Sequence, residues 1–503
     1  MVPLDPEPWP IDHLPLRGES SAIALEDKAG TVDFAGLEQL VGAVAGWLST
    51  VGLRQGDRVA SWLPKTRASV ILPLAVARAG LVHVPVNPLL KRGQVAHILA
   101  DSGAALLITQ GSRSATLLSD DVPAHCHVVM EDAIWGAKVH LPPSDADPGS
   151  LAAILYTSGS TGRPKGVMLS HANLWLGAVS VAHYLRLDPD DRVLAVLPFS
   201  FDYGQNQLFS TWAAGARVIP VDYLTPRDVI KAVERFGANT LAGVPPLWQQ
   251  LVESDWPPTA ATLLKTITNS GGALSRRLVE GLRVTFPMAK IYPMYGLTEA
   301  FRSTYLAPEL VDSNPESIGR AIPFAEILVV RPDGQQARPG EPGELVHAGP
   351  LVAQGYWRDA KRTAERFRPA PSFAQSGGIA VWSGDTVICG SDGLLRFIGR
   401  DDEMIKSAGN RISPSDIEEA ILSGGEAAEA VAIGVADERL GQVIAVVARA
   451  VGDAGLAEQA LRDRLRRDLP NFMQPDRYHW RDALPRNANG KIDRAALKRE
   501  LTR

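Results

Sequence analysis

The stretch Leu155-Tyr-Thr-Ser-Gly-Ser-Thr-Gly-Arg-Pro-Lys-Gly-Val167 joins an apolar segment to a loop of mostly small residues. Gly159 and Gly162 allow backbone conformations that bring amide groups close to an anion. The other phosphate donors of this loop are hydroxyl groups and one cation, from Thr157, Ser158, Ser160, Thr161 and Lys165. We therefore predict that the loop follows a buried strand and binds phosphate, in preference to serving as a flexible linker.

The spacing excludes the better-known phosphate and nucleophile motifs. A Walker loop requires Ser or Thr after its lysine, whereas Gly166 follows Lys165. The segment contains neither a Gly-x-Gly-x-x-Gly fingerprint nor a Gly-x-Ser-x-Gly elbow. It resembles the signature loop of the AMP-forming adenylating enzymes, a superfamily of acyl-CoA synthetases, peptide-synthetase adenylation domains and luciferases. The resemblance implies ATP and Mg²⁺ as cofactors and a small carboxylic acid as substrate.

Length and charge narrow the class of protein. At 503 residues the chain is expected to form two or more domains. A net charge of −5 gives no basic footprint for nucleic acid. The longest apolar run, Ala68 to Ala77, is about half of the ~20 residues needed to cross a membrane. Because Met1 to Glu19 also lacks the pattern of a secretory signal, we predict a cytoplasmic protein that contacts neither nucleic acid nor membrane.

The two cysteines, Cys126 and Cys389, argue against a disulfide framework and fit a reducing compartment. His125 and His127 flank Cys126, and residues two apart on a strand share a face. A metal site is therefore an alternative there, but no second ligand cluster accompanies it. We interpret both cysteines as ordinary thiols.

Apolar runs of strand length alternate with helix-length segments through most of the chain, as in Arg58 to Leu63 followed by Arg67 to Ala79. This rhythm predicts an α/β fold of parallel sheets flanked by helices. After Gly319, turn sequences such as Pro-Asp-Gly indicate the hairpins of a small β subdomain. We predict an N-terminal body over residues 1–401 and a smaller, mobile α+β domain over residues 402–503.

Two further segments carry a narrower resemblance. Val86-Asn-Pro-Leu-Leu-Lys-Arg-Gly-Gln-Val-Ala-His-Ile-Leu99 and Met294-Tyr-Gly-Leu-Thr-Glu-Ala-Phe-Arg-Ser-Thr-Tyr-Leu306 are similar to the AMP-forming acyl-CoA ligases associated with exosortase A systems. The wider superfamily pattern covers nearly the whole chain.

The resemblance implies a nucleotide site built from several segments. In Tyr295-Gly-Leu-Thr-Glu299 the tyrosine lies against adenine, Thr298 reaches phosphate and Glu299 orders Mg²⁺. The backbone of Ser270-Gly271-Gly272-Ala273 approaches the adenine, and Asp385 takes the ribose hydroxyls. Arg400 holds ribose or phosphate. Taken alone, Asp385 and Arg400 would be interpreted as a surface ion pair, but together with the other motifs in order they indicate a functional role.

Lys491 lies in Pro485-Arg-Asn-Ala-Asn-Gly-Lys-Ile-Asp-Arg494, a loop by composition. A lysine near a C-terminus is ordinarily a solvated charge. The resemblance implies instead that Lys491 bridges the substrate carboxylate and the α-phosphate during adenylation. It then leaves as the C-terminal domain rotates about a hinge at Asp402.

The substrate pocket gives a more specific prediction. Phe201-Asp202 matches amino-acid-activating domains, where the aspartate receives the substrate ammonium, and many acyl-CoA synthetases have a histidine in this segment. The alternative is an aspartate that caps a helix beginning after Tyr203. The remaining pocket positions form a polar set, namely Tyr203, Asn206, Thr268, Ser270, Met294, Arg302 and Ser303. Arg302 either pairs with an acidic or carbonyl-bearing substrate side chain or forms a salt bridge in the wall.

We predict a ligase that converts a small polar amino acid to its adenylate and passes the aminoacyl group to a phosphopantetheine thiol. That thiol belongs to CoA or to a separate acyl carrier protein. The four arginines at positions 462, 464, 466 and 467 could attract an acidic carrier protein, or they could form a solvated face of a helix. An acyl-CoA synthetase for a non-amino organic acid is the alternative. A nucleotide-binding scaffold without catalysis would be expected to lack Glu299 or Lys491.

Overall fold

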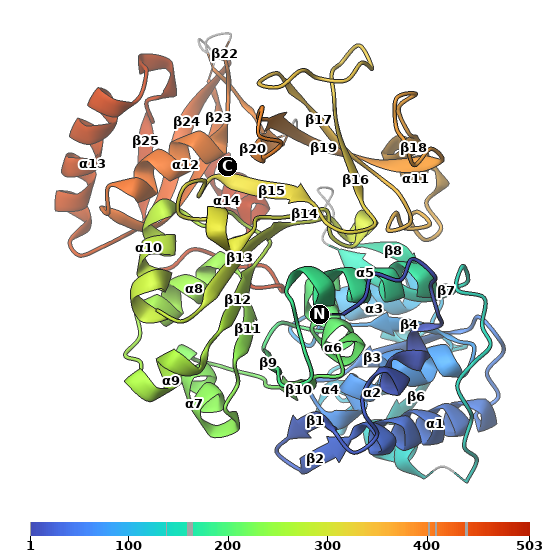
Figure 1. Ribbon diagram of the computed structural model, residues 1–503. Helices are drawn as coiled ribbons and strands as arrows, with labels where there is room; N and C mark the ends of the chain where they lie inside the picture. Colours follow the sequence, from blue (N-terminus) through green and yellow to red (C-terminus); the bar gives the residue numbers. More distant parts are fainter. Residues whose placement is uncertain are drawn as a thin grey trace.

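The computed structural model describes residues 2–136, 138–157, 164–400, 403–407, 410–437 and 441–502. Six predicted site residues lie outside these ranges, namely Ser158, Gly159, Ser160, Thr161, Gly162 and Asp402. In the described part of the chain the model has the predicted α/β architecture (Figure 1).

A six-stranded sheet forms the first half of the N-terminal body. Its strand order is β6-β5-β3-β4-β7-β8, comprising β3 (Arg58–Trp62), β4 (Val82–Pro85), β5 (Leu106–Thr109), β6 (His127–Met130), β7 (Leu151–Thr157) and β8 (Lys165–Ser170). All neighbours pair in parallel except β7 and β8, which are antiparallel with Thr157 opposite Lys165. The predicted phosphate loop therefore joins two strands of a hairpin at the edge of this sheet.

The helices of this half include α1 (Phe34–Thr50), α2 (Arg67–Arg78), α3 (Arg92–Ser102) and the short α4 (Gly111–Ser114). Every residue of α2 from Ala68 to Arg78 is buried, so the longest apolar run of the chain belongs to the core. Among the described residues, no helix combines the length and the apolar character needed to cross a membrane.

The second sheet is longer and runs through the centre of the molecule. In the described part it has fourteen strands. Its parallel part consists of β9 (Arg192–Ala195), β10 (Arg217–Pro220), β11 (Thr240–Gly243), β12 (Thr266–Asn269) and β13 (Lys290–Tyr295). One edge carries β1 (Ile23–Asp27) and β2 (Gly30–Asp33). The helices along this part are α7 (Pro226–Phe236), α8 (Pro245–Val252), α9 (Pro258–Leu263) and α10 (Arg276–Thr285).

Two helices lie between the sheets. The helix α5 (His171–Tyr184) packs against β8 and against α6 (Asp202–Ala213), and α6 packs against β9 and β10. All twelve residues of α6 are buried, including its polar residues Gln205, Asn206 and Gln207. A helix with polar side chains in such a position directs them into the interior of the protein, which is where a polar substrate pocket is expected.

Beyond β13 the same sheet becomes antiparallel, through β14 (Thr304–Tyr305), β15 (Ser317–Ala321), β20 (Leu395–Arg400), β19 (Ile379–Cys389), β17 (Pro342–Ala348) and β16 (Glu326–Val330). The short β18 (Phe367–Pro369) pairs with β19, next to α11 (Ala360–Arg366). The predicted β subdomain is thus an extension of the central sheet, with β16 and β17 paired as the expected hairpin.

The C-terminal unit has its own sheet and its own hydrophobic core. Its strands are β21 (Ile405–Ser407), β22 (Asn410–Ile412), β23 (Ala427–Asp437), β24 (Gly441–Ala450) and β25 (Arg477–Trp480), and its helices are α12 (Pro414–Ser423), α13 (Ala454–Asp468) and α14 (Arg494–Leu501). Figure 1 shows this unit beside β20 and α10, which its helix α12 contacts. A domain boundary at residue 402 stays a prediction.

Candidate active site

The predicted site residues gather where the parallel strands of the central sheet end. Tyr295 is the last residue of β13, Ser270 follows β12 directly, and Asp202 opens α6 after β9. Ligands of α/β proteins bind at this edge because the loops after parallel strands meet there. The described hairpin around Lys491 reaches the same place from the C-terminal unit.

Lys165 and Glu299 form an ion pair in this region. The Lys165 ammonium lies 3.0 Å from Oε1 of Glu299, and the Tyr356 hydroxyl donates a 2.6 Å hydrogen bond to the same oxygen. Lys165 also contacts the Tyr356 hydroxyl at 2.7 Å. Burial favours the neutral carboxyl, but Lys165 and Tyr356 together hold the pKa of Glu299 below its ordinary value. Glu299 is therefore a fixed, ionised carboxylate.

Tyr356 was not among the residues identified from the sequence. It follows Gly355 in the loop between β17 and α11, and it lies beside Val167 of β8 in an isolated antiparallel bridge. A tyrosine after a glycine in a loop is too common to indicate a site. Only the tertiary structure places its hydroxyl between Lys165 and Glu299.

The predicted nucleoside residues are also brought together. The Tyr295 hydroxyl donates a short hydrogen bond to Asp385 Oδ2, and Nε of Arg400 lies 3.6 Å from Asp385 Oδ1. The Asp385 side chain is 5% exposed, which excludes a pair lying wholly on the surface. Burial raises the pKa of Asp385, against the charge of Arg400 and the hydrogen bond from Tyr295. This cluster of polar side chains has donors and acceptors suited to hydroxyl groups.

Lys491 lies directly above a glycine of the predicted adenine loop. Gly271 has φ +84°, and a Cβ there would come within 2.2 Å of Cε and 2.7 Å of Nζ of Lys491. Only a residue without a side chain leaves room for the lysine at this point. The next residue, Gly272, accepts a 2.8 Å hydrogen bond from the Asn269 side chain, and Ala273 continues the loop.

Burial lowers the pKa of Lys491 below its ordinary value. The nearby carboxylate of Asp202 opposes this effect, and the positive charge of Arg302 adds to it. The catalytic lysine predicted from the sequence is therefore close enough to both predicted substrate residues to feel their charges. Lys491 is only partly exposed and packs against Gly271, unlike an ordinary solvated lysine near a C-terminus.

Asp202 is 9% exposed and is the first residue of α6, with Phe201 in the N-cap position. The interpretation of Asp202 as the helix cap is thus wrong, because Phe201 occupies the N-cap position and Asp202 already belongs to the helix. Its Oδ1 accepts a 3.2 Å hydrogen bond from the Thr298 hydroxyl. Asp202, Thr298 and Lys491 consequently converge on one point, where the predicted phosphate and carboxylate contacts would meet.

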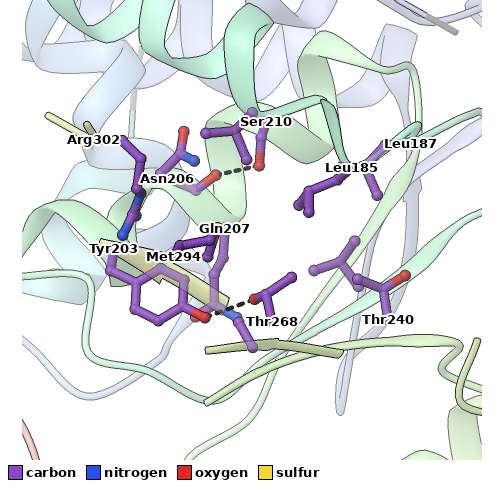
Figure 2. Close-up of a pocket in the computed structure, with 13 residues that line it drawn as sticks. Leu185, Leu187, Tyr203, Asn206, Gln207, Ser210, Thr240, Thr268, Met294 and Arg302 are labelled. Atoms are coloured by element: carbon purple, nitrogen blue, oxygen red, sulfur yellow. Dashed lines mark hydrogen bonds between the residues drawn. The ribbon is translucent and has the colours of Figure 1, made fainter. Parts of the chain in front are cut away.

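A small cavity lies beside this point (Figure 2), with a volume of about 20 Å³. The lining residues include five of the predicted substrate positions, which are Tyr203, Asn206, Thr268, Met294 and Arg302. The Tyr203 hydroxyl lies 2.6 Å from the Thr268 hydroxyl. Oδ1 of Asn206 is buried without a hydrogen-bond partner among the described residues.

Arg302 is only 1% exposed. Its guanidinium donates a 3.0 Å hydrogen bond to the Ser270 hydroxyl and lies 4.6 Å from the centre of the Tyr203 ring. Within the described ranges, no carboxylate oxygen lies within salt-bridge distance of it, and its Nε has no hydrogen-bond partner. The salt-bridged alternative therefore finds no support in the described chain. A buried guanidinium with a free N–H suits a substrate that brings an acceptor.

An unusual turn orients Arg302. Phe301 has φ +60° and ψ −66°, and the Arg302 amide donates a 2.7 Å hydrogen bond to the Ala300 carbonyl. This is a γ-turn of the rare, strained type. The Phe301 ring fills the place that a side chain at Gly177 of α5 would occupy, at 2.3 Å from a Cβ there. No sequence pattern indicates such a turn at a phenylalanine.

Ser303 lies one residue beyond and faces away from the cavity. Its hydroxyl is 3.0 Å from Nδ1 of His347, and Ser303 is absent from the cavity lining. Burial lowers the pKa of His347 to about 3, so the imidazole is neutral. The structure therefore places Ser303 behind Arg302.

The predicted metal alternative, the two cysteines and the arginines of α13 lie outside this site. In the described chain, no group of three or more His, Cys, Asp or Glu side chains is arranged to hold a metal ion. Burial raises the pKa of Cys126 to about 11 and also raises that of Cys389. All four arginines of α13 form ion pairs with neighbouring carboxylates, which are those of Glu458, Glu426, Asp463 and Asp468.

Comparison with known proteins agrees with this geometry. Residues 16–357 match the model of the AMP-binding enzyme family, and residues 416–491 match that of the AMP-binding enzyme C-terminal domain. The chain is 30% identical over 496 residues to the L-proline–[L-prolyl-carrier protein] ligase of Pseudomonas fluorescens, covering 95% of this chain and 96% of that ligase.

Other relatives are much longer than this chain. It is 30% identical over 488 residues to tyrocidine synthase 3 of Brevibacillus parabrevis, covering 95% of this chain but only 7% of that synthase. Among solved structures, O-succinylbenzoate coenzyme A synthetase from Bacillus subtilis in complex with ATP and magnesium ion superposes with a TM-score of 0.82. That pair is 26% identical, over 98% of this chain and 99% of the synthetase. By its sequence and its fold, this chain belongs to the AMP-binding enzyme family.

Proposed function

We propose that the protein is an ATP-dependent, AMP-forming acid–thiol ligase. In the first half-reaction, an oxygen of the substrate carboxylate bonds to the α-phosphorus of ATP and the bond to pyrophosphate breaks. In the second, a thiolate bonds to the acyl carbon and AMP leaves, so that a thioester forms. The observation that carries this proposal is the position of Lys491 above Gly271, beside Asp202 and Arg302.

The residues present fit ATP and Mg²⁺. Thr157 ends β7 with a buried hydroxyl that has no partner among the described residues, and Lys165 begins β8 opposite it. These two groups would hold phosphate, with Tyr295, Asp385 and Arg400 on the nucleoside. Glu299 would bind Mg²⁺, which when bound neutralises charge on the departing pyrophosphate. The anchoring of Glu299 by Tyr356 keeps its carboxylate oriented for that role.

Lys491 would contribute by stabilising the charge shared between the attacking carboxylate and the α-phosphate. Because it belongs to the C-terminal unit, it can be withdrawn when that unit moves. We propose that residues 402–503 rotate about Asp402 between the half-reactions, so that the thiol reaches the acyl group through the space that Lys491 leaves.

We further propose that the acid is a small polar amino acid. Asp202 offers a mostly buried carboxylate one residue from the cavity, and its charge suits the substrate ammonium. The small volume of the cavity favours a small side chain, and Arg302 favours one with an acidic or carbonyl group. The name of the proline ligase among the relatives is consistent with an amino-acid substrate.

The acceptor would be a phosphopantetheine thiol, of a separate acyl carrier protein or of CoA. One relative is named for a carrier protein and one structural neighbour for coenzyme A, so both acceptors occur among similar proteins. Since the α13 arginines are already paired with carboxylates, we do not assign them to carrier recognition.

A second candidate function is a CoA ligase for a non-amino organic acid. It is favoured by the hydrogen bond from Thr298 to Asp202, which gives the carboxylate a structural use that requires no ammonium. Pyrophosphate exchange into ATP, measured across matched pairs of amino acids and their des-amino analogues, separates the two. Exchange that prefers the amino acids supports the first proposal. Exchange that prefers the analogues supports the second, and release of ADP would refute both.

A further inference from the structure

We propose that Asn87, far from Lys491 in the sequence, is a positioning residue that holds the catalytic lysine in the adenylation site. The inference rests on the proposed function of Lys491. It concerns the segment Arg486 to Ile492, which we call the Lys491 hairpin, and the point at which its tip meets the N-terminal body.

The Lys491 hairpin is a preformed unit. Arg486 and Ile492 are paired in an isolated antiparallel bridge, and the side-chain oxygen of Asn487 accepts hydrogen bonds from the amides of Asn489 and Lys491. The Asn487 amide donates to the Lys491 carbonyl at 2.8 Å. Gly490, with φ +78°, closes the turn. A hairpin with so many internal bonds moves as a block, so fixing its tip also fixes the backbone of Lys491.

Its base belongs to the C-terminal unit. The Arg486 guanidinium lies 2.6 Å from Oε1 of Glu429, a buried residue of β23. The hairpin is therefore part of the C-terminal unit. Its position in the active site depends on the contacts that it makes with the N-terminal body.

Asn87 is the residue of the N-terminal body that binds the tip of the hairpin. Its side-chain amide donates to the Ala488 carbonyl at 2.8 Å and to Oδ1 of Asn489 at 3.1 Å. Its own Oδ1 accepts a 2.9 Å hydrogen bond from the Leu89 amide, which fixes the orientation of the side chain. Asn87 is 5% exposed and lies two residues after the end of β4. Among the described residues, these are the only two hydrogen bonds between the hairpin and the N-terminal body.

Among the residues of the proposed chemistry in the described chain, Asn87 is linked by its hydrogen bonds only to the hairpin that carries Lys491. Asn87 contacts the two residues at the tip, and the side chain of Lys491 points from the same hairpin onto Gly271. Loss of the two hydrogen bonds would lower the fraction of molecules with Lys491 in place. Adenylation requires that placement, whereas thioester formation takes place after the hairpin has left. Asn87 should therefore affect only the first half-reaction.

Asn87→Ser isolates this role. A serine hydroxyl can still accept from the Leu89 amide and so preserve the turn, but it is too short to reach Ala488. Asn87→Ala removes both functions. Glu253→Gln is the matched control, because it weakens a different contact between the two units, the 2.9 Å ion pair with Arg449.

The first readout needs no catalysis. The full-length protein without nucleotide is treated with acetic anhydride, and acetylation of Lys491 is followed by mass spectrometry. We expect Asn87→Ser to raise the rate at Lys491 by about five- to thirtyfold, the factor for losing one or two net hydrogen bonds. Glu253→Gln should leave the rate at Lys491 near that of the wild type. An unchanged rate in Asn87→Ser would overturn the proposal.

The second readout separates the half-reactions. Asn87→Ser should slow pyrophosphate exchange, by at most that factor, because exchange follows the fraction of molecules with Lys491 in place. Thioester formation from supplied acyl-adenylate should be unchanged. A merely structural role would lower both half-reactions together, and that result would also overturn the proposal. If the wild type exchanges pyrophosphate with no acid, the proposed function fails, while the acetylation rates still decide whether Asn87 holds the hairpin.

Discussion

The ammonium of Lys165 lies 3.0 Å from Oε1 of Glu299, so the cation expected to bind phosphate is paired with the carboxylate expected to bind Mg²⁺. Each neutralises the other, and the hydroxyl of Tyr356 contacts both. When a magnesium nucleotide binds, two contacts between opposite charges would replace this ion pair. Lys165 would contact phosphate, and Glu299 would contact the metal ion. The phosphate site is thus held together by its own opposite charges.

This pairing makes the role of Glu299 testable. Glu299→Gln keeps the shape of the side chain and an acceptor for Tyr356 but removes the charge. We expect pyrophosphate exchange to fall by about two orders of magnitude and the half-saturating Mg²⁺ concentration to rise. Glu326→Gln, which changes a carboxylate bonded to the backbone amides of Gln375 and Ser376, should leave the Mg²⁺ requirement unaltered. An unaltered requirement in Glu299→Gln would contradict the metal role.

Replacement of Lys491, the proposed catalytic lysine, should affect one half-reaction. Lys491→Ala removes a preorganised charge at the reacting carboxylate and α-phosphate, so adenylation should slow by about two to three orders of magnitude. Thioester formation from supplied acyl-adenylate should be largely retained. Measuring the two steps separately by pyrophosphate exchange and thiol consumption tests this. Equal losses in both steps would count against a lysine that withdraws.

The pKa of Lys491 predicts the alkaline side of the pH profile. Burial favours the neutral amine, so the active, protonated form is lost at a lower pH than the ordinary lysine value of 10.5. The kcat/KM for adenylation should therefore decline as the pH rises through that lowered pKa, since kcat/KM reports groups of the free enzyme. Lys491→Arg should retain its charge and lose this decline. A decline that persists in Lys491→Arg would assign it to another group.

Asp202 should determine the preference for amino acids. If its carboxylate pairs with the substrate ammonium, Asp202→Ala leaves that cation unpaired at a cost of about 2–5 kcal/mol. This corresponds to roughly thirty- to several-thousand-fold in kcat/KM. The des-amino analogue should show no such loss. Because the Thr298 hydroxyl also bonds to Asp202, the KM for ATP is measured alongside. An equal loss of kcat/KM with both acids would show that Asp202 acts on nucleotide binding and not on the substrate ammonium.

Arg302 should select the side chain of the substrate. Arg302→Met keeps an unbranched apolar stem in the buried site and removes the guanidinium. We expect a selective loss of kcat/KM, tenfold or more, for amino acids with a carboxylate or amide side chain, and little change for alanine or serine. Thermal unfolding of the variant checks the fold. A uniform loss across all substrates would show that Arg302 supports the wall instead.

The local chemistry of the chain predicted the phosphate loop, and the family resemblance predicted most of the other site residues. Small residues after a buried strand predicted a loop, and the segment that contains them joins β7 and β8. Gly271 was predicted to let the backbone approach the adenine, and that contact stays a prediction; the structure places the Lys491 side chain against this glycine. Alternating apolar segments predicted the helices and strands, because apolar residues repeat with one spacing along the buried face of a helix and with another along that of a strand.

What could not be predicted depends on contacts between distant segments. The hydroxyl of Tyr356 contacts Glu299 and Lys165, which are 57 and 191 residues away, and Asn87 donates to Ala488, which is 401 residues away. Asn87 lies in a segment that carries a family resemblance, but that resemblance assigned it no role. The start of α6 was misplaced because Phe201, which has no capping side chain, occupies the N-cap position. Ser303 was assigned to the pocket by spacing, but the turn at Phe301 directs it toward His347.

That turn has a consequence for the evolution of substrate range. The backbone at Phe301 is strained, and its ring rests in a gap that exists only because position 177 is a glycine. The turn that orients Arg302 therefore depends on space left by Gly177 of α5, which is absent from the cavity lining. A lineage could alter which acids it accepts by substituting position 177 alone, without changing any cavity-lining residue. Selection on the accepted acid would then act on a position outside the pocket.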